Sequence, residues 1–202
     1  MGQARHEPSN SHHKNRLYLK DAKLLSSDSQ RGLRVGSEFE DKQKIAEVVL
    51  RYCRGVDRLD FEMIRSCYHD GAIDHHTGFD GDADGYVAWL EKVLPRFAGT
   101  MHMVGNELID VQGDFARSET YGTAHHWADP VTDPRLNFVS GFRYVDNMQR
   151  RDDEWRIAER WAIREWTRSI PPETVRPKEA EGPDPRRDRS DPIYLGWPPA
   201  ER

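Results

Sequence analysis

The chain has 202 residues, of which 36% are hydrophobic and 32% are charged, and its formal net charge is −5. This length favours one domain over two, and a hydrophobic share below the usual ~45–50% indicates that part of the chain lies outside any core. Residues 39–170 hold 24 acidic and 17 basic side chains. Because this acidic region repels phosphate backbones, nucleic acid is excluded as a partner.

Membrane and secreted proteins are also excluded. The longest apolar runs fall far short of the ~20 residues that a membrane-spanning helix needs, and the first residues lack the layout of a secretory signal. The two cysteines, Cys53 and Cys67, allow neither a disulfide scaffold nor a cysteine-type zinc site. The sequence therefore predicts reduced thiols in a cytoplasmic protein that has no membrane partner.

Both ends of the chain differ from its middle. Residues 1–36 are polar and mildly basic, which is typical of a mobile or partner-docked arm. Residues 171–202 hold eight of the twelve prolines, and they predict an extended tail because proline disrupts helices and central strands. The apolar stretch 193–197 of this tail is expected to dock on a neighbouring subunit. The folded domain is therefore placed at residues 37–170.

Three helices are expected at the start of this domain. Ser37 to Glu40 has the pattern of a capping box that begins the first helix, and apolar residues then recur at three- and four-residue spacing as far as Val56. Asp60 can cap a short second helix. A third helix is expected after Asp84.

Four long strands are expected after the third helix. They are rich in aromatic and β-branched residues and cover 101–111, 115–127, 136–149 and 155–167. The segments 112–114 and 151–153 between them have the composition of hairpin turns. Helices followed by an antiparallel meander indicate the α+β class, with the helices on one face of a curved sheet.

Two titratable residues fall on faces that are otherwise apolar. Asp57 continues the apolar stripe of the first helix, where a carboxylate is costly to bury without a partner. The alternative is that Asp57 caps the following helix. His102 lies between two methionines on the first long strand, where a carboxylate would have to fix its tautomer. The alternative is that His102 is a hydrogen-bonded histidine of the core.

Further polar candidates lie on strands. His125 and His126 are adjacent and so point to opposite faces, which allows one of them to reach a pocket and argues against a metal site built from the pair. The same objection applies to a metal site at His75 and His76. Together with Asp74 they lie on a short strand expected before the third helix, and one of the three, His76 rather than the others, is expected to face the pocket as a second acid or base.

Arg164 either points inward, where it could hold a substrate anion, or is a solvated charge on the sheet. Without a phosphate-binding glycine loop, no nucleotide cofactor is expected. No pair of helical histidines has metal-ligand spacing, so no metal is expected either, and a metal held by distant histidines is the alternative.

The pattern resembles the SnoaL-like branch of the nuclear transport factor 2-like (NTF2-like) superfamily over residues 39–170. The shared features are Tyr52 and Asp57 at the end of the first helix, Met101-His102-Met103 at the start of the sheet, and the hairpin 150–157. The resemblance implies a cone-shaped α+β barrel. In that fold a strongly bent antiparallel sheet wraps about three N-terminal helices around a deep apolar pocket.

The set Tyr52, Asp57 and His102 is similar to that of three cofactor-free lyases, scytalone dehydratase, bile-acid 7α-dehydratase and hexachlorocyclohexane dehydrochlorinase. The resemblance implies that His102 is the general base, that Asp57 orients it, and that Tyr52 hydrogen-bonds a substrate oxygen. His125 aligns with a second polar catalytic residue of the dehydratases. Arg164 aligns with an arginine near the end of the last strand in the bile-acid enzyme.

The sequence therefore predicts a cofactor-independent lyase of aromatic compound catabolism. The reaction would be dehydration or a related elimination, including retro-aldol release of formaldehyde, on a hydrophobic aromatic or polycyclic hydroxylated substrate. The residues expected to bind that substrate are His76, Met101, Met103, Tyr121, Trp127 and Phe142.

Two alternative functions stay open. A ketosteroid-type isomerase would need a carboxylate base on the sheet, and a non-catalytic NTF2-like binding or assembly subunit would have no reason to bring Asp57 and His102 together. Aromatic residues in excess of one small core predict a homo-oligomer. The resemblance to trimeric dehydratases implies that this oligomer is a trimer.

Overall fold

The computed structural model describes residues 37–128, 134–170 and 186–195. The chain divides into two compact units, Met1–Glu40 and Asp41–Arg202. In the first unit the described residues are the exposed helical residues 37–40. The expected N-terminal arm and much of the expected C-terminal tail lie outside the described residues, at 1–36, 171–185 and 196–202.

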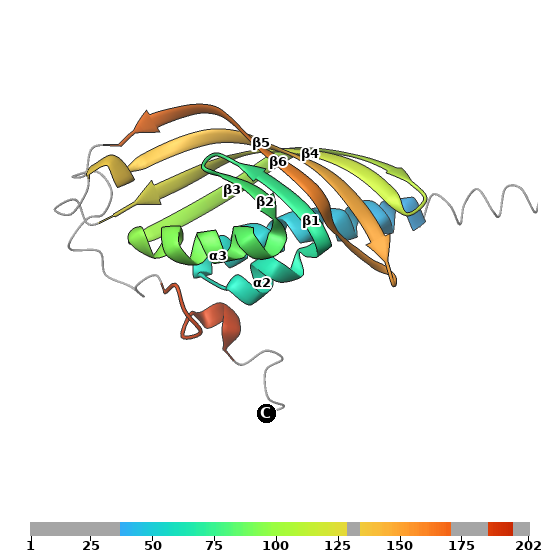
Figure 1. Ribbon diagram of the computed structural model, residues 1–202, viewed down its shortest axis with the longest axis horizontal. Coiled ribbons are helices and arrows are strands. Elements are labelled where there is room, and N and C mark those ends of the chain that lie inside the picture. The colour runs from blue at the N-terminus through green and yellow to red at the C-terminus, as the bar shows by residue number, and fades with distance from the viewer. Residues whose placement is uncertain (1–36, 129–133, 171–185, 196–202) are drawn as a thin grey trace, which may run out of the picture. The chain divides into compact units, whose positions relative to one another are not determined.

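Six strands of the described residues form one curved, unclosed sheet (Figure 1). They are β1 (Tyr68–His76), β2 (Phe79–Asp82), β3 (Gly99–Gln112), β4 (Phe115–Trp127), β5 (Phe138–Arg151) and β6 (Glu154–Ser169). Their order in the sheet is β2-β1-β6-β5-β4-β3. Neighbouring strands are antiparallel except β1 and β6, which are parallel. The predicted α+β class is confirmed.

The parallel pair is a feature that the sequence does not predict. β1 has nine residues, whereas the sequence indicates only a short strand before the third helix. β6 reaches β1 after the chain has crossed the helical layer and returned through β3, β4 and β5. The relative direction of β1 and β6 therefore depends on the whole topology and not on a local hairpin.

Two tight hairpins join the long strands in pairs. β3 turns into β4 at Gly113 (φ 63°), and β5 turns into β6 at Asp152 (φ 51°) and Asp153 (φ 63°). This left-handed backbone is accessible to glycine and, among other residues, mainly to Asn and Asp. Both hairpins lie where the sequence predicts them.

Three helices of the described residues cover one face of the sheet (Figure 1). They are the first helix at residues 37–58, α2 (Phe61–Ser66) and α3 (Ala83–Val93). Asp60 caps α2 as predicted, since its Oδ1 accepts a hydrogen bond from the Met63 amide at 3.1 Å. The predicted beginning of α3 is wrong, because Asp82 and not Asp84 is its N-cap, accepting from the Gly85 amide at 2.7 Å. None of the described helices is long and apolar enough to cross a bilayer.

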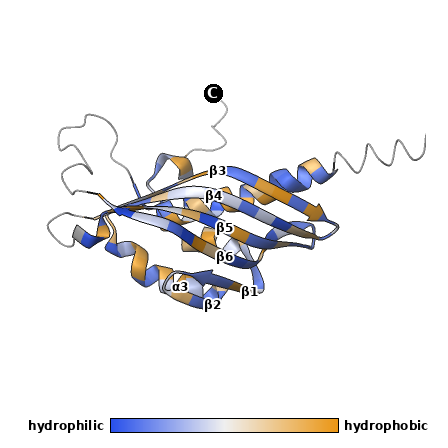
Figure 2. Ribbon diagram, turned by 90° about the horizontal axis from the view of Figure 1, so that it is seen from above, coloured by the Kyte–Doolittle hydropathy of each residue, from blue (hydrophilic) through white to orange (hydrophobic). Residues whose placement is uncertain are grey.

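The core lies between these helices and the face of the sheet that they cover, here called the inner face. Hydrophobic and hydrophilic residues alternate along the strands (Figure 2), so one set of side chains points to the helices and the other to the outer face. Gly55 lets α2 approach the first helix, because a Cβ there would lie 2.7 Å from Ile64 Cγ1. The buried core includes Ile45, Val49, Ile64, Tyr86, Leu90, Met148 and Ile157.

A fully buried ion pair lies within this core. Arg160 binds Asp146 through Nε at 2.7 Å and through Nη2 at 2.6 Å, and both side chains have no exposed surface. The guanidinium lies over the rings of Tyr52, at 4.4 Å, and Tyr144, at 4.1 Å. A buried charge needs such partners, and the contact holds the Tyr52 ring in place.

Residues 186–195 of the C-terminal tail contact the same chain. Tyr194 donates a hydrogen bond to Asp60 at 3.0 Å, and Asp191 pairs with Arg58 at 3.0 Å. Arg187 reaches the main-chain oxygen of Phe97 at 2.7 Å. The described part of the tail therefore lies against the end of the first helix, the start of α2 and the segment after α3.

Candidate active site

A cavity of about 240 Å³ lies between the helices and the inner face of the sheet. Its wall combines aromatic and aliphatic side chains with convergent polar groups, which is a composition found in small-molecule sites. The first helix, α3 and strands β1, β3, β4, β5 and β6 all contribute to it. Its polar lining residues are Tyr52, His76, Thr77, Tyr86, His102, His126, Ser140, Tyr144 and Arg164.

Asp57 and His102 are hydrogen-bonded partners beside this cavity. Asp57 Oδ1 lies 2.7 Å from His102 Nδ1, and Asp57 Oδ2 accepts from the His102 amide at 2.9 Å. Thr100 Oγ1 donates to the same carboxylate at 2.9 Å. The role of capping the next helix belongs to Asp60, so Asp57 is left to hold His102, which lines the cavity.

The carboxylate of Asp57 stays ionised in this environment. Burial raises the pKa of Asp57, but the hydrogen bonds and charge of His102 and the hydrogen bond of Thr100 together lower it below its ordinary value. An ionised carboxylate at Nδ1 keeps the proton on that nitrogen and leaves the lone pair on Nε2. His102 therefore has the form that a general base requires.

The structure places His126, and not His125, in the cavity wall. His126 pairs with Thr100 across the β3–β4 ladder, whereas His125 pairs with Met101. Directly opposed residues share a face of the sheet, so His125 and Met101 both point to the outer face. The expectation that His125 reaches the pocket is therefore wrong.

His126 is a neutral polar group next to His102. Its ring stacks on Phe138 at 4.4 Å and meets the ring of His102 edge-on at 5.9 Å. Burial, followed by the nearby charge of His102, lowers the pKa of His126 to about 3. Its Nδ1 is buried without a hydrogen-bond partner among the described residues, and the residue as a whole lines the cavity.

The predicted binding residues divide between the two faces. His76 and Phe142 line the cavity. Met101 and Met103 are 45% and 59% exposed, on the outer face. They are the sequence neighbours of His102 on β3. Because successive residues of a strand point to opposite faces, both methionines point outward when His102 points into the cavity.

Tyr121 and Trp127 do not line the cavity as predicted, whereas Arg164 does. Tyr121 is 44% exposed and lies outside the cavity wall. The Trp127 ring covers the backbone at Gly99, where a Cβ would come within 2.1 Å of it, and this ring is not part of the cavity wall. Arg164 lines the cavity while remaining exposed, so it lies where the cavity meets solvent.

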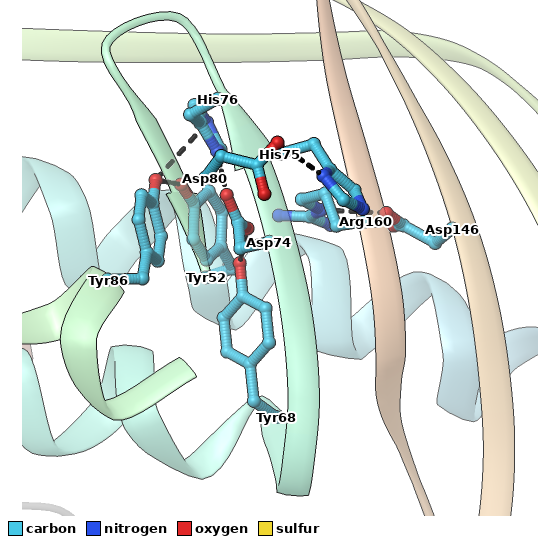
Figure 3. A network of polar contacts seen from close by, with 9 residues as sticks. All are labelled: Tyr52, Tyr68, Asp74, His75, His76, Asp80, Tyr86, Asp146 and Arg160. Carbon is cyan, nitrogen blue, oxygen red and sulfur yellow. Dashed lines mark hydrogen bonds and ion pairs between the residues drawn. The ribbon is translucent and has the colours of Figure 1, made fainter. Parts of the chain in front are cut away.

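Asp74 and His76 form a second Asp–His pair (Figure 3), and His76 lines the cavity. Asp74 is completely buried, accepts a hydrogen bond from Tyr68 at 2.6 Å and binds His76 Nδ1. His76 Nε2 lies 3.2 Å from the Tyr86 hydroxyl, which lies 2.5 Å from the Tyr52 hydroxyl. The sequence singles out His76 and Tyr52 and offers Asp74 only as an alternative to His76 on the same strand, whereas Tyr86 is not among the predicted site residues. The spacing of Asp74 and His76, two residues apart on one strand face, is the signal that could have found this pair.

The described residues contain neither a cluster that could hold a metal ion nor a thiol that is ionised at neutral pH. No group of three or more His, Cys, Asp or Glu side chains there is arranged to hold a metal ion. Cys53 and Cys67 are buried and free, and burial raises their pKa to about 12 and about 11. Both thiols therefore remain protonated at neutral pH.

Solved structures share this fold. The hexachlorocyclohexane dehydrochlorinase LinA type 2 is 16% identical with a TM-score of 0.63, and the match covers 71% of this chain and 97% of that protein. A candidate scytalone dehydratase from Novosphingobium aromaticivorans is 20% identical with a TM-score of 0.61, covering 67% and 91%. Kfla4162 from Kribbella flavida is 20% identical with a TM-score of 0.60, covering 65% and 95%.

Sequence relatives occur in mycobacteria. Over 130 residues the chain is 28% identical to the uncharacterized protein Rv2910c of Mycobacterium tuberculosis and to Mb2934c of Mycobacterium bovis. These matches cover 61% of this chain and 85% of each relative. The sequence model of the SnoaL-like domain family matches residues 37–161. This range includes most of the residues that line the cavity, on helices as well as on strands. The chain therefore belongs to the SnoaL-like family of the NTF2-like superfamily.

Proposed function

We propose that this protein is a cofactor-independent lyase in which His102 is the general base and Asp57 orients it. The observation that carries the proposal is the 2.7 Å contact between Asp57 and His102 Nδ1 beside a largely apolar cavity. Membership of the SnoaL-like family and a fold shared with LinA support an enzyme of the dehydratase or lyase type.

The reaction starts at His102 Nε2. This nitrogen takes a proton from a carbon next to a carbonyl group or an aromatic ring, and the imidazolium that forms is stabilised by Asp57. The electron pair of the broken C–H bond forms a C=C bond as the leaving group departs with its own bonding pair. In the retro-aldol variant His102 takes the proton of a hydroxyl group, the O–H pair forms the C=O bond of formaldehyde, and the pair of the broken C–C bond moves into the enolate of the neighbouring carbonyl group.

Polar groups on the cavity wall can stabilise the negative charge that develops on the substrate. Tyr52, His126 and Arg164 line the cavity from the first helix, β4 and β6. In a site that excludes water, each such donor contributes on the order of 3 kcal/mol to the transition state. These three residues are proposed to hydrogen-bond substrate oxygens, His126 and Arg164 the oxygen that gains charge when the C–H bond breaks, and Tyr52 the oxygen of the leaving hydroxyl group.

The cavity favours a small aromatic substrate within the predicted class. Its volume of about 240 Å³ lies below the ~300–1,000 Å³ of typical ligand pockets. Phe97, Phe138 and Phe142 supply apolar surface against which an aromatic ring can pack. We therefore propose a compact hydroxylated aromatic compound, with water or formaldehyde as the leaving group.

The two alternative functions have less support. A ketosteroid-type isomerase needs a carboxylate base on the sheet, and no Asp or Glu of the described residues lines the cavity. A non-catalytic binding or assembly subunit would not need the hydrogen-bonded pair of Asp57 and His102 beside the cavity.

The test is turnover of a panel of aromatic and steroidal alcohols, diols and hydroxy-ketones, with products identified by mass spectrometry. The wild type should release water or formaldehyde, and His102→Gln should lose this activity. His125→Gln is the matched control, because the neighbouring side chain points to the outer face. Equal turnover by wild type and His102→Gln would overturn the proposal, and a product of unchanged mass would favour an isomerase.

A further inference from the structure

We propose that Asp74 and His76, connected through Tyr86 to Tyr52, form the general acid of the same reaction and protonate the leaving group while His102 removes the proton from carbon. This inference rests on the proposed lyase function. It assigns separate acid and base groups to two walls of one cavity, whereas His102 acting alone would have to perform both steps.

The four groups form a continuous hydrogen-bonded chain (Figure 3). Asp74 binds His76 Nδ1, His76 Nε2 lies 3.2 Å from the Tyr86 hydroxyl, and the two tyrosine hydroxyls are 2.5 Å apart. His76, Tyr86 and Tyr52 all line the cavity. A proton that starts on His76 can therefore reach the cavity without crossing a gap.

Asp74 is placed to compensate a positive charge on His76. It has no exposed surface, and its second oxygen accepts a hydrogen bond from Tyr68 at 2.6 Å. A buried carboxylate needs a cationic or hydrogen-bonding partner. Arg160 is paired with Asp146, and the cationic partner that Asp74 contacts among the described residues is the ring of His76.

Two tyrosine rings pack near the ring of His76. Tyr86 of α3 stacks on its ring at 4.7 Å, and Tyr144 of β5 lies at 6.2 Å. His75 turns to the opposite face of β1, where it binds Asp80 at 3.0 Å and Glu159 at 3.5 Å. Among the described residues, the ion pair of His76 is with Asp74.

The hydrogen bonds between His76, Tyr86 and Tyr52 can be donated in either direction along the chain at the observed distances. With a proton on His76 Nε2, that nitrogen donates to Tyr86, Tyr86 donates to Tyr52, and Tyr52 donates into the cavity. With His76 neutral, Tyr86 donates to His76 and Tyr52 donates to Tyr86. The change of direction is the transfer of one proton along the chain.

The elimination step then balances. The departing hydroxyl group takes the C–O bonding pair and the Tyr52 proton, Tyr52 takes the Tyr86 proton, and Tyr86 takes the proton of His76 Nε2. At the other wall His102 takes the proton from carbon, and the C–H pair forms the C=C bond. The products are an alkene and water, and the proton on His102 returns to His76 through solvent before the next turnover.

This transfer keeps both tyrosines neutral, as their burial requires. Burial raises the pKa of Tyr52 and of Tyr86 far above the ordinary value for tyrosine. A stepwise route through a tyrosinate would therefore be unfavourable at neutral pH. A concerted shift avoids that ion, because each hydroxyl gains a proton as it gives one away.

The test compares two leaving groups on one carbon skeleton. The probes are a phenyl-substituted β-hydroxy ketone and the matching β-chloro ketone, both of which form the same conjugated enone, detected by its ultraviolet absorbance. Hydroxide needs a proton to leave, but chloride does not. His76→Gln and Tyr86→Phe should therefore lower the rate with the hydroxy ketone by about 10²–10⁴-fold more than the rate with the chloro ketone.

The chloro ketone is also the control for folding, since its elimination needs an intact Asp57–His102 pair. His102→Gln should lower the rates of both probes, and His75→Gln should change neither. Equal losses on both ketones, or no loss on either, in His76→Gln and Tyr86→Phe would overturn the proposed acid while leaving the lyase in place. A wild type inactive on both ketones would overturn the acid together with the base.

Discussion

The guanidinium of Arg187 donates a hydrogen bond to the main-chain oxygen of Asp57 at 3.2 Å, although the two residues lie 130 positions apart in the chain. The same guanidinium donates to Phe97 O at 2.7 Å and to Thr100 Oγ1 at 3.3 Å. Thr100 in turn donates to the Asp57 carboxylate. The C-terminal segment therefore supports, from outside the cavity, the carboxylate that orients His102.

Replacing Arg187 by Ala should lower turnover more than substrate affinity. The substitution removes support from Asp57 but leaves the cavity wall intact, so we expect kcat to fall on the order of tenfold with a small change in KM. Added guanidinium ion should restore part of the loss, because it can occupy the vacated position. Arg186→Ala, at the exposed neighbouring position, is the control. Wild-type kinetics in Arg187→Ala would show that the support is irrelevant to catalysis.

Asp57 should make the folded state less stable in acid. Its pKa is lower in the folded protein than the ordinary value of 3.8, so the unfolded chain binds more protons as the pH falls through that range. The stability that Asp57 contributes is present above about pH 4 and lost below it. Asp57→Asn should therefore destabilise the protein at neutral pH, and this difference should shrink in acid. Urea unfolding across the range measures it, with the exposed Asp110→Asn as control.

His126 should add a second dependence of stability on pH. Its folded pKa is about 3, whereas an unfolded histidine has a pKa of ~6.5. Between these values the unfolded state binds more protons, so the free energy of unfolding should fall, by up to about 1.4 kcal/mol per pH unit, as the pH decreases. His126→Phe should flatten this slope. His125→Phe, on the outer face, should leave it unchanged, and an equal slope in both variants would contradict the assignment.

The buried ion pair of Arg160 and Asp146 should contribute strongly to the free energy of unfolding of the protein. Each single replacement, Arg160→Met or Asp146→Asn, leaves a buried charge without its partner, and we expect a loss of about 3–5 kcal/mol. Replacing both residues should cost less than the sum of the single losses, because neither charge remains. A double-mutant cycle by chemical denaturation gives the coupling. Additive losses would show that the two side chains act independently.

We propose that the outer face of the sheet is where copies of this chain associate, with a homotrimer as the expected assembly. Met101, Met103, Tyr121 and Trp166 are between 44% and 59% exposed on this face, and a cluster of exposed apolar residues is typical of an interface. Light scattering coupled to size exclusion should detect an oligomer, and Met103→Glu should shift it towards the monomer. A monomeric wild type at all concentrations would contradict this prediction.

Local features of the fold can be predicted from the sequence because they depend on neighbouring residues. Asp60 caps α2 through the amide three residues away, and Asp152 and Asp153 close a hairpin by their own backbone conformation. Asp57 and His102 could be singled out because each is a polar residue in an apolar stripe. Their partnership came from a family resemblance, and it involves residues 45 positions apart.

The remaining features depend on packing between distant parts of the chain. Alternation along β4 separates His125 from His126, but which of them faces the cavity depends on which side of the sheet the helices cover. The chain from Asp74 to Tyr52 joins β1, α3 and the first helix, and Arg187 reaches Asp57 from the C-terminal segment. Periodicity assigns residues to a common face, whereas contacts between elements exist only once the helices, the sheet and the tail have packed together.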